Sequence, residues 1–182
     1  MMSKQLLRVV CCLVWVWTGT TSVLFAKAEL GQVPPVLELS EQAGGRVDGS
    51  AWSSHELKGK VHLLVYSSPG KKEANNKATE AIKAERFAAD TFSSVAVVNM
   101  KASMIPDFLI ARAIKKKQRD YPRTLYVKDA KRKLVDSWGF EDDENVLAVF
   151  DKTGALVYKH AGSLPEKDIP GLLRLIKEKI AL

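Results

Sequence analysis

One turn in the sequence combines residue types that could bind an anion. It follows the apolar run 61–66 and consists of Ser67, Ser68, Pro69, Gly70, Lys71 and Lys72. A helical pattern begins after it, and the first backbone N–H groups of a helix have no partner within that helix. Gly70 would let a ligand approach those groups, and the two lysines would attract a phosphate or a carboxylate. In the alternative interpretation, Ser68 only caps the helix, Pro69 begins it and the lysines are merely solvated.

A second candidate is the basic stretch 112–133, which holds ten basic and two acidic side chains. Its first six basic residues are named the basic patch here: Arg112, Lys115, Lys116, Lys117, Arg119 and Arg123. Such clustering favours an acidic partner or an anionic envelope component such as lipid or lipopolysaccharide. It is also typical of an ordinary charged helix end followed by the rim of a hairpin.

Other kinds of site are not predicted. His55, His62 and His160 are scattered, and no close group of His, Cys, Asp or Glu has the spacing of a metal site. The serines form no Gly-x-Ser-x-Gly elbow. The acidic run 141–144 lacks the alternating ligands and the glycine of a calcium loop. We therefore predict no metal, no cofactor and no catalytic residue, and we expect His62 to be packed within a strand.

The candidate turn follows the strand around which the fold is organised. Residues 61–66 form a nearly continuous apolar run bounded by turn residues, which indicates a strand buried on both faces. The pattern predicts further strands at 93–100, 123–128, 145–150 and 155–160, a short element at 134–140, and helices at 71–87, from Pro106 to Tyr121, and from Ser163 onward. Strands that alternate with helices predict an α/β fold with parallel pairing, and the final hairpin makes the sheet mixed.

Residues 32–58 precede this unit and predict an N-terminal β-hairpin extension. A strand is expected at 36–39, a turn at 43–46 and a single helical turn at 53–57. Trp52 and Trp138 are the simplest candidates for large anchors of the core.

The N-terminus predicts export. Lys4 and Arg8 precede the apolar run 9–17, and Ala26 and Ala28 are the small residues that a signal peptidase reads. An uncleaved membrane anchor is the alternative, but polar residues 18–22 interrupt the run before the roughly 20 residues that a span requires. We predict a secretory signal over residues 1–28 and a single domain over residues 29–182, with no membrane span after processing.

Cleavage would remove both cysteines, because none follows Cys11 and Cys12. The processed protein would then have no disulfide, no thiolate nucleophile and no cysteine metal ligand. Cleavage also removes three of the 28 basic residues and no acid, so that the net charge falls from +7 to +4.

Several stretches resemble the YtfJ family of periplasmic proteins from Gram-negative bacteria and, more widely, exported thioredoxin-like and peroxiredoxin-like folds. They are 31–35 (GQVPP), 52–61 (WSSHELKGKV), 81–83 (AIK), 121–122 (YP) and 150–154 (FDKTG). The resemblance spans nearly the whole chain after residue 28. It implies a thioredoxin-like fold and a periplasmic location, but no particular biochemical activity.

The sequence departs from redox-active thioredoxins at both halves of their site. Those proteins carry a Cys-x-x-Cys pair at the turn after the central strand, where residues 68–74 contain no sulfur. They also carry a proline before the strand that faces the cysteines, where this chain has Glu144 and Asn145. Because thiol–disulfide exchange requires a thiolate, the processed protein is not expected to be a thiol–disulfide oxidoreductase.

We predict a non-catalytic periplasmic module that binds another protein or an anionic component of the cell envelope. The alternative is an enzyme with thiol-independent chemistry in the pocket after the central strand. That enzyme would require convergent titratable side chains near residues 67–72. Nucleic acid is not a predicted partner, because the chain is exported and the basic stretch lacks interleaved exposed aromatic residues.

Overall fold

The computed structural model describes residues 27–182. The predicted signal, residues 1–28, lies almost entirely outside the described residues. Within residues 27–182, no helix is both long enough and apolar enough to cross a bilayer.

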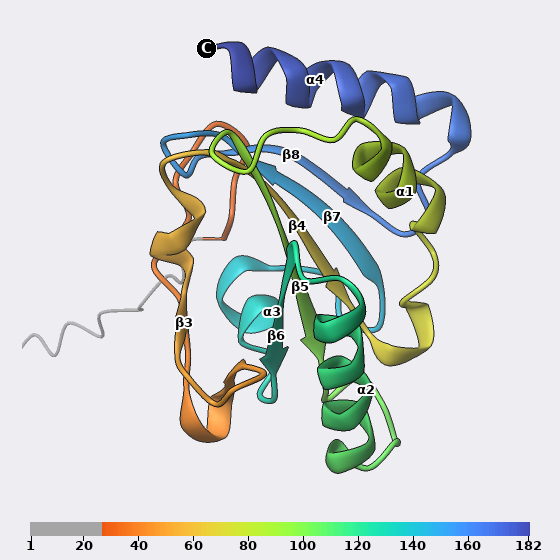
Figure 1. Cartoon of the computed structure of the whole chain (residues 1–182). Helices are drawn as coiled ribbons and strands as arrows, with labels where there is room; N and C mark the ends of the chain where they lie inside the picture. Colours follow the sequence, from red (N-terminus) through yellow and green to blue (C-terminus); the bar gives the residue numbers. More distant parts are fainter. Residues whose placement is uncertain (1–26) are drawn as a thin grey trace, which may run out of the picture.

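A six-stranded mixed sheet forms the centre of the fold (Figure 1). Its strands are β2 (Gly44–Arg46), β4 (Val61–Ser67), β5 (Phe92–Asn99), β6 (Thr124–Asp129), β7 (Asn145–Phe150) and β8 (Leu156–Ala161). The order across the sheet is β2-β6-β5-β4-β7-β8. β4 and β6 both pair parallel with β5, whereas β7 pairs antiparallel with both β4 and β8. The predicted central position of the 61–66 strand and the mixed sheet are confirmed.

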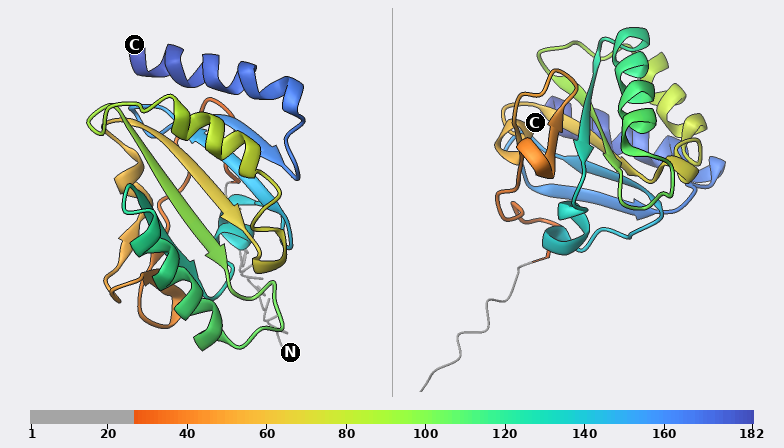
Figure 2. Two further views of the ribbon diagram at one scale, coloured as in Figure 1. Left: turned by 45° about the vertical axis from the view of Figure 1, so that its right-hand side comes forward. Right: turned by 90° about the horizontal axis from the view of Figure 1, so that it is seen from below.

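Helices cover both faces of this sheet (Figure 2). Three of them pack on one face: α1 (Asn76–Ala84), α2 (Asp107–Asp120) and α4 (Ile169–Ala181). The short helix α3 (Lys133–Trp138) packs on the other face with the N-terminal segment. Successive side chains of β4 point to opposite faces of the sheet. Leu63 packs with side chains of α1 and α4 on one face. Leu64 packs on the other face, in the cluster that contains Trp52 and Trp138. Both tryptophans are buried core anchors, as predicted.

The N-terminal extension forms with one difference from the prediction. β1 (Glu38–Leu39) and β3 (Trp52–Ser53) pair antiparallel as a small hairpin, and Ser54–Leu57 makes the single helical turn. The segment predicted as a turn between them contains β2, which extends the main sheet by pairing with β6. Gly44 permits this close approach. Its φ is +128°, and a Cβ there would lie 1.9 Å from the carbonyl oxygen of Lys128.

The helix after β4 also differs from its predicted bounds, because α1 begins at Asn76 and not at Lys71. Pro69–Lys71 forms one 3-10 turn, and a run of turn residues follows it. Asn75 accounts for the later start. Its side chain is buried and hydrogen-bonded to Asn145 at the start of β7, so the chain is tied to the sheet before the helix can begin.

Candidate functional site

Of the seven buried polar residues within residues 27–182, all except His62 gather at one edge of the sheet. The parallel strands β4, β5 and β6 end at this edge and β7 begins there, as the register pairs Ser67 with Asn145 and Asn99 with Asp129 show. Six buried polar residues lie at this edge or just beyond it and are named the polar edge: Ser67, Ser68, Asn75, Asn99, Asp129 and Asn145. In open α/β sheets, ligands usually bind beyond the carboxyl ends of the strands, so this is the edge to examine for function.

On the α1 face, the polar edge is a pair of asparagines that hold three loops together. The side-chain amide of Asn75 donates to Oδ1 of Asn145 at 2.8 Å and to the carbonyl oxygen of Gly162 at 2.9 Å. Its own Oδ1 accepts from the backbone N–H of Leu164 at 2.8 Å. The Asn145 amide donates to the carbonyl oxygen of Lys71 at 3.0 Å. These bonds fix the turn after β4, the start of β7 and the loop after β8 against one another.

On the α3 face, the polar edge contains the buried carboxylate of Asp129. It accepts from the backbone N–H groups of Lys133 at 2.8 Å and Leu134 at 3.0 Å, and it lies 3.4 Å from the hydroxyl of Tyr66. Burial raises the pKa of Asp129 above its ordinary value, because desolvation outweighs these hydrogen bonds. Burial, with the nearby carboxylate of Asp129, also raises the pKa of Tyr66. Because the N–H groups of Lys133 and Leu134 belong to the start of α3, their bonds to Asp129 fix the first turn of this helix.

Asn99 ties the same region to the acidic run 141–144. Its Oδ1 accepts from the backbone N–H groups of Lys101 at 3.2 Å and Ala102 at 3.3 Å. Its amide donates to Asp142 at 2.7 Å, and Asp142 pairs with Arg132 at 2.9 Å. From the sequence alone, the acidic run is expected to be a solvated connection between the short element and the next strand. Asp142 is exposed, but it is also paired.

The residues of the predicted anion-binding turn are divided between the interior and the surface. Ser67 and Ser68 are buried, whereas Gly70, Lys71 and Lys72 are exposed. Ser68 makes no side-chain capping bond, contrary to the alternative interpretation, and its buried hydroxyl has no hydrogen-bond partner within residues 27–182. The N–H groups of Lys71, Ala74 and Asn76 donate to carbonyl oxygens three residues back. These three amides are therefore not available to an anion, and anion binding at this turn stays a prediction.

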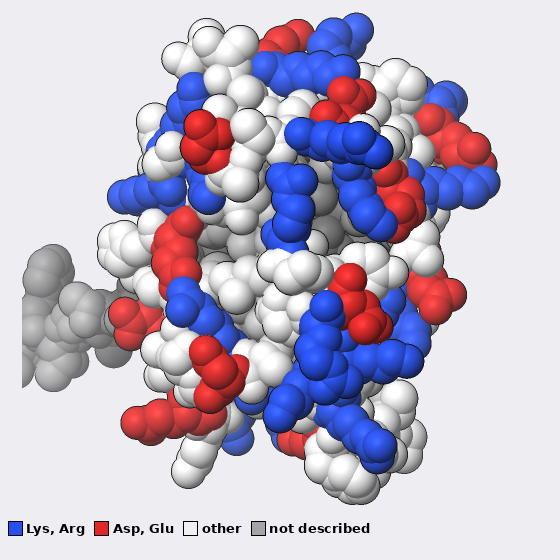
Figure 3. All heavy atoms as spheres, viewed as in Figure 1, with Lys and Arg blue, Asp and Glu red and all other residues white. Residues whose placement is uncertain are grey.

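The basic patch lies along α2 and just beyond its end. All six of its side chains are exposed, and the blue surface over α2 in the lower right of Figure 3 shows how densely they gather. Two of them are turned toward local partners. Nζ of Lys117 lies 5.0 Å from the ring centre of Tyr121, and the guanidinium of Arg123 donates to the carbonyl oxygen of Phe87 at 2.7 Å.

Two hollows within residues 27–182 are candidate ligand sites. One, of about 400 Å³, lies between the start of α1 and the loop after β8. Its charged rim consists of Glu73, Lys77 and Glu166, of which the last two form an exposed ion pair with each other. Ser163 also lines this hollow, and its hydroxyl donates a hydrogen bond to the carbonyl oxygen of Ala74.

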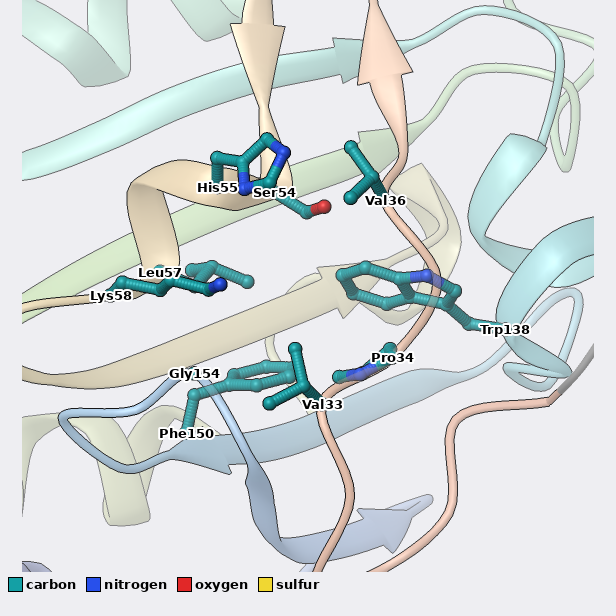
Figure 4. A pocket seen from close by; sticks show the side chains of 10 residues that line it. All are labelled: Val33, Pro34, Val36, Ser54, His55, Leu57, Lys58, Trp138, Phe150 and Gly154. Atoms are coloured by element: carbon teal, nitrogen blue, oxygen red, sulfur yellow. The ribbon is translucent and has the colours of Figure 1, made fainter.

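The other hollow lies under the N-terminal segment and is apolar (Figure 4). Figure 4 shows the Trp138 indole between Val36 and Pro34, with Phe150 beside Val33. The indole N–H donates to the carbonyl oxygen of Pro35 at 2.9 Å. The enclosed volume is about 20 Å³, which is room for one water molecule. The second hollow is too small for a substrate, and on the rim of the first hollow Lys77 and Glu166 already pair with each other at the exposed surface.

The family of this chain is established by comparison with known proteins. The family described as bacterial proteins of unknown function, YtfJ_HI0045, matches residues 37–179. The chain belongs to this family. An uncharacterized protein of Haemophilus influenzae is 26% identical over 183 residues, covering 96% of this chain and 97% of that protein. The resemblance noted from the sequence is thereby confirmed.

Solved structures establish the fold. The exposed lipoprotein thioredoxin Etrx1 of Streptococcus pneumoniae superposes with a TM-score of 0.59 and 21% identity, covering 79% of this chain and 99% of that one. A putative thiol:disulfide interchange protein DsbE of Chlorobium tepidum gives a TM-score of 0.63 and 18% identity, covering 85% and 99%. The predicted thioredoxin-like fold is confirmed. At these identities the likeness concerns the fold alone.

Sequence reasoning missed most of the polar edge as a unit. Asn99 and Asp129 carried a usable signal, because each ends a buried parallel strand, and such ends meet at one edge. Asn75 and Asn145 carried none that we could use, since they are 70 residues apart and meet only in the folded chain.

Proposed function

We propose that the protein is an exported, non-catalytic binding module of the cell envelope, released into the periplasm by cleavage near Ala28. The N-terminal pattern of residues 1–28 supports export. One structural neighbour is itself described as an exposed lipoprotein, which shows that an exported protein can have this fold. Residues 27–182 contain no cysteine, so the domain has no thiolate of its own for disulfide exchange.

The hydrogen bonding of four of the six polar-edge side chains is the observation that carries the proposal. A general acid or base must offer its proton or lone pair to a substrate. The side chains of Asn75, Asn99, Asp129 and Asn145 are instead bonded to backbone groups of the surrounding loops and to one another. Their arrangement supports a structural role at the place where thioredoxin-like proteins carry their chemistry.

The exposed basic side chains of α2 are better suited to binding a partner. Arg112, Lys115, Lys116 and Arg119 form no ion pair with any acid of residues 27–182. Unpaired charges of one sign on a rigid helix attract an oppositely charged partner over about a Debye length. We therefore place the binding surface on α2.

Crosslinking in living cells tests the proposal. A photoreactive amino acid replaces Lys116 in α2 or, as a matched exposed control, Lys167 before α4, and the cells are irradiated before fractionation. We expect recovery in the periplasmic fraction, with a mass that places the N-terminus near Glu29, and adducts from position 116 only. Recovery in the cytoplasm would contradict the export part. Equal adducts from both positions, or none from position 116, would contradict the binding part.

A further inference from the structure

The loop before α2 and the first turn of this helix expose large apolar side chains. Met104 is fully exposed at 102% of its reference area, Phe108 at 70%, Ile105 at 47% and Leu109 at 44%. These four residues are named the apolar tip. Scattered exposed apolar residues are normal on a protein surface, but four within six positions form a contiguous patch that indicates an interaction site.

The apolar tip and the basic residues share the exposed side of α2 but occupy different parts of its length. Ile110 and Ile114 mark the buried side. At 1.5 Å of rise per residue, Arg112 lies about 6 Å along the axis from Phe108, and Lys116 about 12 Å. In Figure 3, white surface at the lower end of α2 gives way to blue surface above it. Apart from Asp107 at its first position and Asp120 at its last, the exposed side of α2 thus has large apolar side chains at its N-terminal end and positive ones over its C-terminal half.

We propose that the apolar tip inserts into the surface of a bilayer that contains anionic phospholipid, with Arg112, Lys115, Lys116 and Arg119 at the headgroups. The inference deepens the proposed function, on which it rests, by naming the chemistry of the partner. Peripheral helices bury apolar side chains about 5–10 Å into the boundary between headgroups and acyl chains, and basic side chains bind the anionic headgroups above it. The order of apolar and basic residues along α2 matches this depth profile when the helix end enters first.

The shape of the tip favours lipid over an acidic protein. Met104 makes no packing contact that reduces its exposed area, and it projects from a loop at the end of the molecule. A protein partner would need a cavity shaped for this projection, whereas a lipid surface adapts to it. Lys117 and Arg123 face Tyr121 and Phe87, which leaves Arg112, Lys115, Lys116 and Arg119 to face the headgroups.

Fluorescence of a single label at the tip tests the inference. In the protein as the cell processes it, Met104→Cys is coupled to the environment-sensitive dye NBD, and mass spectrometry confirms one label per chain. We expect a blue shift and a rise in emission with phosphatidylglycerol/phosphatidylcholine vesicles, weakened by salt. Little change is expected with phosphatidylcholine alone. The same label at Leu182→Cys, an exposed apolar residue at the C-terminus, should not respond.

Matched variants then assign the binding to α2. Lys115→Gln with Lys116→Gln should weaken vesicle binding about 25-fold, since each basic residue near an anionic surface contributes about fivefold. Phe108→Ser should weaken it at least about tenfold. Lys167→Gln with Arg174→Gln removes the same charge from the region of α4, at the opposite end of the molecule (Figures 1 and 2), and should have little effect.

The inference is overturned if the label at position 104 does not respond to anionic vesicles, or if the α2 pair (Lys115 and Lys116) and the control pair (Lys167 and Arg174) weaken binding equally when replaced. Protein adducts from position 116 in cells without vesicle binding would leave the binding module standing and reject lipid as its partner. Vesicle binding by a protein found only in the cytoplasm would reject the export part and leave the lipid-binding surface standing.

Discussion

Replacing Asp129 by alanine tests the structural role assigned to the polar edge. The carboxylate accepts well-formed bonds from the backbone N–H groups of Lys133 and Leu134, at 2.8 and 3.0 Å, and longer ones from the N–H of Lys131 and the hydroxyl of Tyr66, at 3.3 and 3.4 Å. A buried donor left without a partner costs about 1–3 kcal/mol. Two such donors give a loss of about 2–6 kcal/mol, and relief of the buried charge reduces it, so we expect about 3 kcal/mol for Asp129→Ala.

The variant Asp129→Asn separates the hydrogen bonds from the charge. It keeps one acceptor oxygen and removes the carboxylate whose pKa burial raises. A raised pKa in the folded state means that the stability contributed by Asp129 is complete below its unfolded pKa of about 3.9 and is lost as pH rises through the folded pKa. The free energy of unfolding of Asp129→Asn, minus that of the parent protein, should therefore increase as pH rises from about 4 to 7.

Urea unfolding at several pH values, followed by the fluorescence of the buried tryptophans Trp52 and Trp138, measures both effects. All other titrating groups are shared, so the difference between the parent protein and Asp129→Asn isolates Asp129. A loss below about 1 kcal/mol for Asp129→Ala, or a difference that does not change with pH, would refute the assignment.

Three further predictions concern stability and use the same unfolding assay. Asn145→Ala should cost about 2–3 kcal/mol, because it leaves the buried amide of Asn75 without one acceptor and a carbonyl oxygen without its donor; a cost near zero would contradict the network. Burial lowers the pKa of His62, so its contribution is complete above about pH 6.5 and is lost as pH falls through the folded pKa. His62→Asn should weaken the loss of stability at acid pH, and a pH profile of unfolding free energy equal to that of the parent protein would contradict this role of His62. Gly44→Ala should cost more than about 2 kcal/mol through its clash with Lys128, whereas tolerance would show that β2 does not pair as described.

The sheet was largely predictable because its inner strands are apolar on both faces. The run 145–150 coincides with β7, and 61–66 differs from β4 by one residue. β2 was not predictable, since Gly44 and Gly45 are typical of a turn. They form a strand only because β6 lies beside them. Local propensity likewise predicted the start of the first helix too early, because the tertiary bonds of Asn75 delay it.

Candidate sites were predictable where they depend on composition and not where they depend on contacts. The basic patch depends on residues close together in the sequence, and the structure shows that all six are exposed along α2 and just beyond its end. Binding at this patch stays a prediction. The apolar tip was not recognised. From the sequence alone, Phe108 and Leu109 fit the inner stripe of this helix together with Ala111 and Ile114. In the structure, Phe108 and Leu109 are both exposed, and the buried positions are Ile110 and Ile114. Apolar residues near a helix end satisfy a core pattern whether or not the core extends that far.

Hydrogen exchange, read by mass spectrometry with and without anionic vesicles, tests the central claim most directly. We claim that binding occurs on α2 and that the polar edge is structural. The account predicts that vesicles slow exchange in residues 101–119 and leave residues 67–76 and 144–146 unchanged. Slower exchange confined to residues 67–76 and 144–146, with none in α2, would contradict it.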